Sequence, residues 1–244
     1  ASGVVEARTE NIAVGAALWA LWGYAQRADA FRITQVHLPA DPSFELRRPL
    51  EGANLWEVDL GAVAEQLWRQ HPSLKDVRVV RQLPNAIRVT AIRRIPAAQV
   101  RLHPTDGGAG RWYPVDREGF VLPEGTAEPA DRLVRIVGFQ RASIALTPGD
   151  VNDHERLQLA LKVLQKLQRS PMGLWRRVTE LDVADAARLT FILDDETEIR
   201  CGSEAELDAQ LARLRAALKA MARQPVKARY IDVRFQDPVM APAS

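Results

Sequence analysis

The sequence predicts an α+β fold in three parts: an N-terminal apolar helix, a small α+β domain, and a mainly antiparallel β domain with two helices. The first observation behind this prediction is an uncharged run at residues 12–25. The second is an amphipathic stretch at residues 59–70 that precedes a strand–turn–strand pattern at residues 77–98. The third is a series of short strands and two helical stretches after residue 98. At 244 residues the chain is long enough for two domains with separate cores.

The uncharged run at residues 12–25 has its aromatic residues, Trp19, Trp22 and Tyr24, near its C-terminal end. A helix that crosses a membrane needs about 20 apolar residues, so this run is short for a complete span. Aromatic side chains at one end are typical of a membrane–water interface. The pattern leaves three interpretations open: a membrane anchor, a buried helix, or the apolar part of a signal peptide.

The small α+β domain is predicted to start with a short strand at residues 31–36. In the helix at residues 59–70, Asp59 is placed to cap the N-terminus and Pro72 prevents the helix from continuing. Apolar residues recur there at helical spacing. The buried side of this helix is predicted to carry Leu60, Val63, Ala64, Leu67 and Trp68.

A β-hairpin at residues 77–98 follows this helix. Residues 83–86, Leu-Pro-Asn-Ala, supply turn chemistry, and Pro96 ends the pattern because proline cannot donate to a sheet. Successive strand side chains point to opposite faces. The inward residues are predicted to be Val77, Val79, Ile87, Val89 and Ala91. The outward residues are predicted to be basic, namely Arg78, Arg88 and Arg94.

Beyond residue 98 the predicted elements are mostly short strands. Helices are predicted to begin near Asn152 and Ser203, each with a glutamate three residues later, as in a capping box. The predicted strands cover residues 99–103, 111–115, 133–137, 178–183, 188–193, 197–201 and 228–235.

Four stretches stand out when they are read in chain order. They are Asn-Leu-Trp-Glu-Val-Asp-Leu at residues 54–60, Arg-Gln-Leu-Pro at 81–84, Tyr-Pro-Val-Asp-Arg-Glu-Gly-Phe-Val-Leu at 113–122 and Tyr-Ile-Asp-Val-Arg-Phe at 230–235. Together they resemble the FtsQ/DivIB family of bacterial cell division proteins, and the first two resemble its POTRA domain. Further residues that carry the resemblance to the POTRA domain are Phe31, Ile33, Val36, Leu67, Pro72, Val77, Val79, Val89, Pro96 and Ala97.

This resemblance implies a membrane-anchor segment at residues 1–30, a POTRA domain at 31–97 and an FtsQ-type β domain at 98–244. It implies a single-pass protein of the cytoplasmic (inner) membrane, with its folded domains on the extracytoplasmic side at the division septum. The implied role is a non-enzymatic scaffold of the divisome that links FtsB and FtsL to septal peptidoglycan synthesis. An alternative is a POTRA-containing module of an outer-membrane assembly or secretion system.

The last predicted strand, residues 228–235, is expected to lie at a sheet edge and to offer unpaired backbone groups to an incoming strand. The resemblance implies that this end receives a segment of FtsB. Pro238 follows closely and removes one backbone donor. The alternative is that the strand only closes its own sheet. The expected partner contacts are Tyr230, Arg234, Phe235, Val239 and Met240.

The sequence predicts no catalytic, metal, cofactor or small-molecule site. The four histidines lie in separate segments without ligand spacing, and no nucleophile elbow or dinucleotide fingerprint occurs. The glycine-rich residues 105–110 lack the ending of a phosphate-binding loop and are interpreted as a hairpin loop. Cys201, the single cysteine, is predicted to be structural, and the acidic residues 194–196 are predicted to form a solvated turn rather than a cation site.

Nucleic acid is not predicted as a partner. Seven basic residues and one acid lie between Lys75 and Arg101, but no stacking aromatic residue lies among them. The formal net charge of the chain is only +2, which gives no general attraction to nucleic acid. The basic hairpin is interpreted as a solvated strand face, with an acidic partner or anionic lipid as alternatives.

Overall fold

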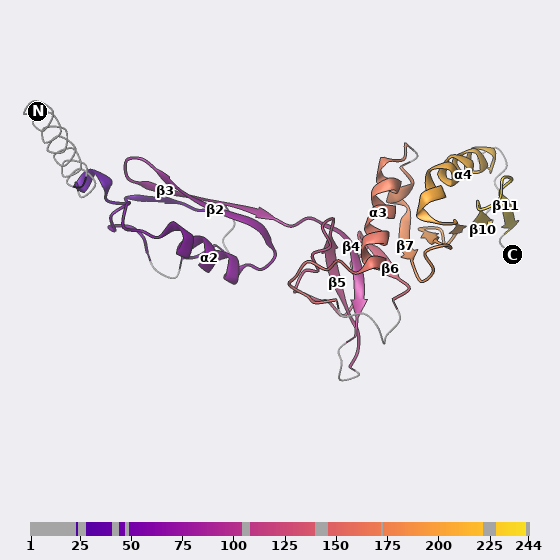
Figure 1. The fold of residues 1–244 in the computed structure, drawn as a ribbon, viewed down its shortest axis with the longest axis horizontal. Coiled ribbons are helices and arrows are strands. Elements are labelled where there is room, and N and C mark those ends of the chain that lie inside the picture. The colour runs from indigo at the N-terminus through magenta and orange to yellow at the C-terminus, as the bar shows by residue number, and fades with distance from the viewer. Residues whose placement is uncertain are drawn as a thin grey trace, which may run out of the picture. The chain divides into compact units, whose positions relative to one another are not determined.

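In a computed structural model the chain forms two compact units, residues 1–93 (unit 1) and residues 94–244 (unit 2), with a mixed α+β fold (Figure 1). The run predicted to anchor the chain, residues 12–25, lies outside the described residues except for Gly23. Within the described ranges, no helix is long and apolar enough to cross a membrane. The structure describes residues 23, 28–40, 44–46, 49–103, 108–139, 146–171, 173–221 and 228–242.

From residue 28 onward, the described residues of unit 1 form a three-stranded sheet and one α-helix. Strand β3 is the middle strand; it is parallel to β1 and antiparallel to β2. The pair β2–β3 is the predicted hairpin, whereas the first strand starts later than predicted because Phe31 ends a 3₁₀ turn. The elements are η1 (Asp29–Phe31), β1 (Gln35–His37), α2 (Leu60–Gln70), β2 (Leu74–Gln82) and β3 (Ala86–Arg93).

Helix α2 has the predicted limits. The Asp59 side chain accepts a hydrogen bond from the Ala62 backbone N–H at 3.0 Å, which confirms it as the N-cap. The prediction for the buried side was wrong at one residue, Trp68. The Trp68 side chain is 52% exposed, because its neighbour Leu67 takes the position that faces the core and the next helical residue points about 100° away.

The core of unit 1 lies between α2 and one face of the sheet. Val77 pairs with Ala91 and Val79 pairs with Val89 across the hairpin, and their side chains pack with Leu67. The predicted inward face of the hairpin is therefore confirmed. The buried residues of this core are Ile33, Phe44, Leu55, Leu67, Leu74, Ile87 and Val89.

The basic residues of the hairpin are spread over both faces. Arg78 and Arg88 are exposed on the outward face, as predicted. Arg81 is turned inward, where its guanidinium donates hydrogen bonds to the carbonyl oxygens of Leu55 and Val58 at 2.8 and 3.0 Å. This arginine ties the segment before α2 to the sheet.

Arg94 was predicted to be outward, and that prediction is wrong. This residue belongs to unit 2, and its side chain is only 8% exposed. Its Nη1 lies 2.6 Å from the buried Asp116 carboxylate, and its guanidinium stacks 3.7 Å from the centre of the Phe120 ring. The alternating pattern of a strand could not show this, because Arg94 lies between two strands and Asp116 comes from a segment 22 residues away.

The described residues of unit 2 form an eight-stranded sheet with two α-helices on one face. The strand order is β11-β10-β9-β8-β7-β6-β4-β5. Its elements are β4 (Pro96–Leu102), β5 (Arg111–Asp116), β6 (Val134–Val137), α3 (Glu155–Arg169), η2 (Leu174–Arg176), β7 (Val178–Asp182), β8 (Thr190–Leu193), β9 (Glu198–Arg200), η3 (Glu204–Glu206), α4 (Leu207–Met221), β10 (Ala228–Asp232) and β11 (Val239–Pro242).

The sheet of unit 2 is mixed: four of its seven described strand pairs are antiparallel, in line with the predicted mainly antiparallel domain, and three are parallel. The pairs β4–β6, β6–β7 and β9–β10 are parallel, and the other described pairs are antiparallel. The helices explain two of the parallel pairs, since α3 connects β6 to β7 and α4 connects β9 to β10. Both crossovers move toward the same edge of the sheet, and the strands that they connect all run in the same direction. Because crossover connections have the same handedness, both helices lie on one face of the sheet.

The core of unit 2 lies between these helices and the sheet. Phe191 and Leu181 of the sheet and Leu157 and Leu214 of the helices are fully buried in it. The opposite face of the sheet carries polar residues. Arg135 on β6 and Glu180 on β7, for example, pair at 3.4 Å. That face is therefore suited to solvent or to a polar partner.

Candidate partner-binding strand

The C-terminal edge of the unit 2 sheet is formed by β11. Strand β10 is paired on both sides, in parallel with β9 and antiparallel with β11. The prediction that residues 228–235 form the edge is therefore wrong, because four further residues, Val239–Pro242, add one more strand. Among the described strands none pairs with the outer side of β11. The edge that can accept another strand lies there.

The five residues predicted to contact a partner gather around this edge. Tyr230 lies half-buried in β10, Val239 and Met240 lie in β11, and Arg234 and Phe235 lie in the connection between the two strands. The Phe235 ring is 56% exposed. Half of the large apolar residues that are exposed in the described part of unit 2 fall within residues 235–240.

The two predicted contacts in β11 point to opposite faces of the sheet. Val239 pairs with Asp232, on the face away from the helices, whereas Met240 pairs with the buried Ile231, on the face that the helices cover. Val239 and Met240 are 48% and 46% exposed. A strand added to β11 would contact both side chains.

The polar part of this edge is held by ion pairs. Arg234 donates to the Asp232 carboxylate, with an Nη2–Oδ2 distance of 2.5 Å. This hydrogen bond holds the pKa of Asp232 below its ordinary value and raises the pKa of Arg234. Arg234 is therefore charged but already matched by a carboxylate, and its side chain is fixed in position.

Sequence reasoning missed a second arginine of this region. Arg200 on β9 lies 4.1 Å from the centre of the Tyr230 ring and pairs with Glu198 at 2.9 Å. The hydrogen bonds that Arg200 donates to the Glu198 carboxylate raise the pKa of Arg200, so the guanidinium stays charged. Strand alternation already indicated that Arg200 and Glu198 share a face, but only the parallel pairing of β9 with β10 places Tyr230 beside them.

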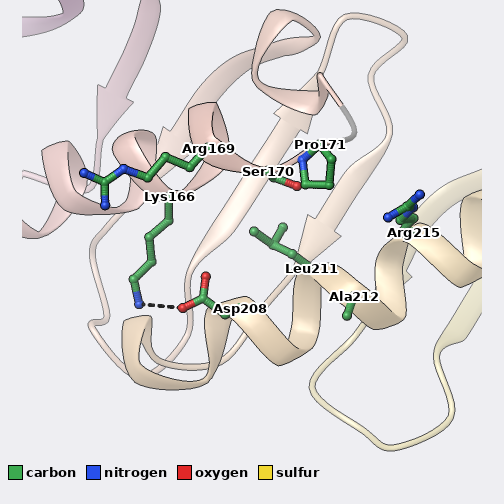
Figure 2. Close-up of a pocket in the computed structure, with 8 residues that line it drawn as sticks. All are labelled: Lys166, Arg169, Ser170, Pro171, Asp208, Leu211, Ala212 and Arg215. Carbon is green, nitrogen blue, oxygen red and sulfur yellow. Dashed lines mark ion pairs between the residues drawn. The ribbon is translucent and has the colours of Figure 1, made fainter.

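A separate cleft of about 560 Å³ lies between α3 and α4. Figure 2 shows Lys166 reaching from α3 to Asp208 near the start of α4, with Leu211 between the two helices. Lys166 also pairs with Glu204 at 2.5 Å, and this hydrogen bond raises the pKa of its ammonium group. A lysine that stays protonated cannot act as a nucleophile or base at neutral pH, so this contact links the helices.

The other groups considered for chemistry have structural surroundings. Cys201 is buried, and burial raises the pKa of its thiol to about 12, so the thiol keeps its proton at neutral pH. In the acidic turn, Asp194 and Asp195 pair with Arg177 at 3.0 and 2.7 Å. Among the described residues, no group of three or more histidine, cysteine or acidic side chains could hold a metal ion.

Comparison with known proteins gives the family. The model of the C-terminal region of cell division proteins FtsQ/DivIB matches residues 105–234, more than half of the chain. The chain belongs to the FtsQ/DivIB family of cell division proteins. The model of the FtsQ-type POTRA domain matches residues 45–91. The resemblance seen in the sequence is thus confirmed, for the FtsQ-type POTRA domain and for the region that follows it.

A relative with the name cell division protein FtsQ, from Myxococcus fulvus, is 30% identical to this FtsQ/DivIB family member over 173 residues. The match covers 70% of this chain and 57% of the relative. The chain thus spans less than two thirds of that FtsQ protein's length. The FtsQ-type match in unit 1 and the FtsQ/DivIB match in unit 2 follow the order predicted from the sequence.

Proposed function

We propose that this chain is a non-enzymatic scaffold of the divisome, and that the β10–β11 end of unit 2 binds FtsB in a complex that includes FtsL. The observation that carries the proposal is the edge strand β11, with exposed apolar side chains beside it. Family membership supports a role in cell division. The FtsQ/DivIB match over residues 105–234 favours this role over the alternative, a module of an outer-membrane assembly or secretion system.

The proposed binding mode is strand addition. An extended segment of FtsB pairs with the backbone of β11, while its side chains contact Val239 on one face and Met240 on the other. Phe235 adds an exposed ring beside the strand. Pro238 precedes the strand and Pro242 is its last residue; both lack backbone donors, so the register of an added strand is confined to a short segment.

The proposed setting is the cytoplasmic membrane at the division septum, with both folded units on the extracytoplasmic side. Residues 12–25 are the proposed single-pass anchor, within an N-terminal segment of residues 1–30. The proposed functional domains are the POTRA domain at residues 31–97 and the FtsQ-type β domain at residues 98–244. The scaffold needs no cofactor, metal, nucleic acid or small-molecule substrate.

Copurification with FtsB tests this function. The tagged chain is coexpressed with FtsB and FtsL, and compared with Phe235→Ala and with a chain truncated after Gln236. Both changes are expected to abolish copurification of FtsB and to leave the circular dichroism of the fold unchanged. Trp175→Ala is the matched control, because this ring is also exposed in unit 2 but lies in η2. If both changed chains retain FtsB, the partner site lies elsewhere.

A further inference from the structure

The chain enters unit 1 at the end of the sheet that carries the β2–β3 turn. The Thr34 backbone N–H donates to the Asn85 carbonyl oxygen at 2.9 Å, and Gln35 pairs with Ala86 at the start of β3. Figure 1 shows η1 and this turn at the same end of unit 1. A membrane anchor before residue 28 would therefore hold this end nearest to the bilayer.

The turn end of unit 1 presents an apolar and basic surface. Leu83 in the turn is 60% exposed, and Val80 on β2 is 38% exposed. Val80 pairs with the exposed Arg88 on β3, and Arg88 also pairs with the exposed His37 on β1. These three residues therefore form one row across the sheet. The turn surface is defined here as Val80, Leu83, Arg88 and His37.

The charge of the turn surface is one-sided. Arg78, next to this row on the same face, adds a second exposed arginine. The acid on the outward face of the hairpin, Asp76, pairs with Ile92, at the other end of the strands from the turn. The Arg88 guanidinium donates to the Gln82 side-chain oxygen at 3.2 and 3.1 Å, which holds it extended beside the turn. The face is therefore cationic near the turn.

We infer that the turn surface docks on the anionic headgroups of the bilayer that holds the anchor. This inference rests on the membrane attachment given under the proposed function. Basic side chains bind anionic headgroups, each strengthening binding about five-fold, and an exposed leucine can enter the interface. Residues 26–34 reach at most about 30 Å, so the tether keeps the turn surface close to the lipid. At such high local concentration a small contact is sufficient.

The experiment uses the full chain in lipid nanodiscs of phosphatidylcholine alone or of equal parts phosphatidylcholine and phosphatidylglycerol. An environment-sensitive dye is attached through Thr90→Cys, an exposed position on the same face as Arg88. The buried Cys201 remains unlabelled because its thiol is protonated. The dye emission is expected to shift to shorter wavelength only with phosphatidylglycerol, and the shift is expected to be lost at high salt.

Two double variants separate docking from general charge effects. Leu83→Ser with Arg88→Glu is expected to remove the emission shift, whereas Val151→Ser with Arg215→Glu, an equal change at exposed positions of unit 2, is expected to preserve it. Equal emission in the two kinds of disc overturns the docking on lipid and favours an acidic protein as the partner of this face. A chain that does not coelute with either disc overturns the membrane attachment itself, and the docking with it.

Discussion

Arg94 is the residue whose environment departs most from its sequence pattern. Its side chain and that of Asp116 are 8% and 7% exposed, so the two charges depend on each other. Arg94→Leu leaves the Asp116 carboxylate buried without its partner, and the expected loss is about 3–5 kcal/mol in the free energy of unfolding. Chemical denaturation of the purified chain measures this loss.

The matched control for Arg94 is Arg78→Leu, which removes the same charge at an exposed position. The expected change there is within about 0.5 kcal/mol. Equal losses for the two variants would contradict the buried ion pair. Sequence reasoning could place Arg94 only by alternation, because a residue's burial depends on partners that fold next to it from distant segments.

Asp232 makes the free energy of unfolding depend on pH in the acidic range. The hydrogen bond from Arg234 lowers the pKa of Asp232, so the charged carboxylate stabilises the folded state fully above its unfolded pKa of about 3.9. This stabilisation is lost as the pH falls through the lower folded pKa. The expected result is a fall in the free energy of unfolding below about pH 5 that is shallower in Asp232→Asn. Identical slopes in urea denaturation across this pH range would contradict the assignment.

At the scale of single elements, the β2–β3 hairpin offers a test of register. Val89 is buried against α2, whereas Arg88 is exposed on the other face. Val89→Asp buries an unpaired charge and is expected to cost several kcal/mol. Arg88→Asp is expected to cost less than about 1 kcal/mol. Thermal melts decide between them, and similar losses for the two variants would show that the register is wrong.

Strand β11 is an element that the sequence did not predict. Pro238 and Pro242 suggest that no strand follows residue 235, but proline is tolerated in edge strands, where one side of the backbone has no neighbour. The proposed contact residues could still be chosen, because the family resemblance seen in the sequence covers this end of the chain. The position of Val239 and Met240 on opposite faces of the sheet could not be predicted, since it depends on the pairing of β11 with β10.

Two of the parallel strand pairs in unit 2 could have been predicted from the sequence. A helix between two strands of one sheet is typical of a parallel crossover, and both helices, α3 and α4, lie between predicted strands. The short strands around them favoured an antiparallel interpretation instead. The parallel pair β4–β6 has no such signal, because its connection passes through β5 and irregular chain rather than an α-helix.

At the scale of the whole molecule, the anchor is a prediction that rests on sequence. The full chain and a chain that starts at Phe31 are expressed and fractionated in parallel. The full chain is expected in the membrane fraction, because residues 12–25 are uncharged and end in aromatic residues. The shorter chain is expected in the supernatant. A full chain that stays in the supernatant after ultracentrifugation without detergent would contradict the anchor.

Hydrogen exchange at β11 shows whether FtsB binds by adding a strand to this edge. Backbone amides of an edge strand become protected when another strand pairs with them. The purified chain is exchanged alone and with the extracytoplasmic segment of FtsB. We expect slower exchange at residues 239–241 with FtsB, and unchanged exchange at Arg111–Asp116, the strand at the other edge of the sheet. Unchanged exchange at residues 239–241 in a chain that demonstrably binds FtsB would contradict strand addition at β11.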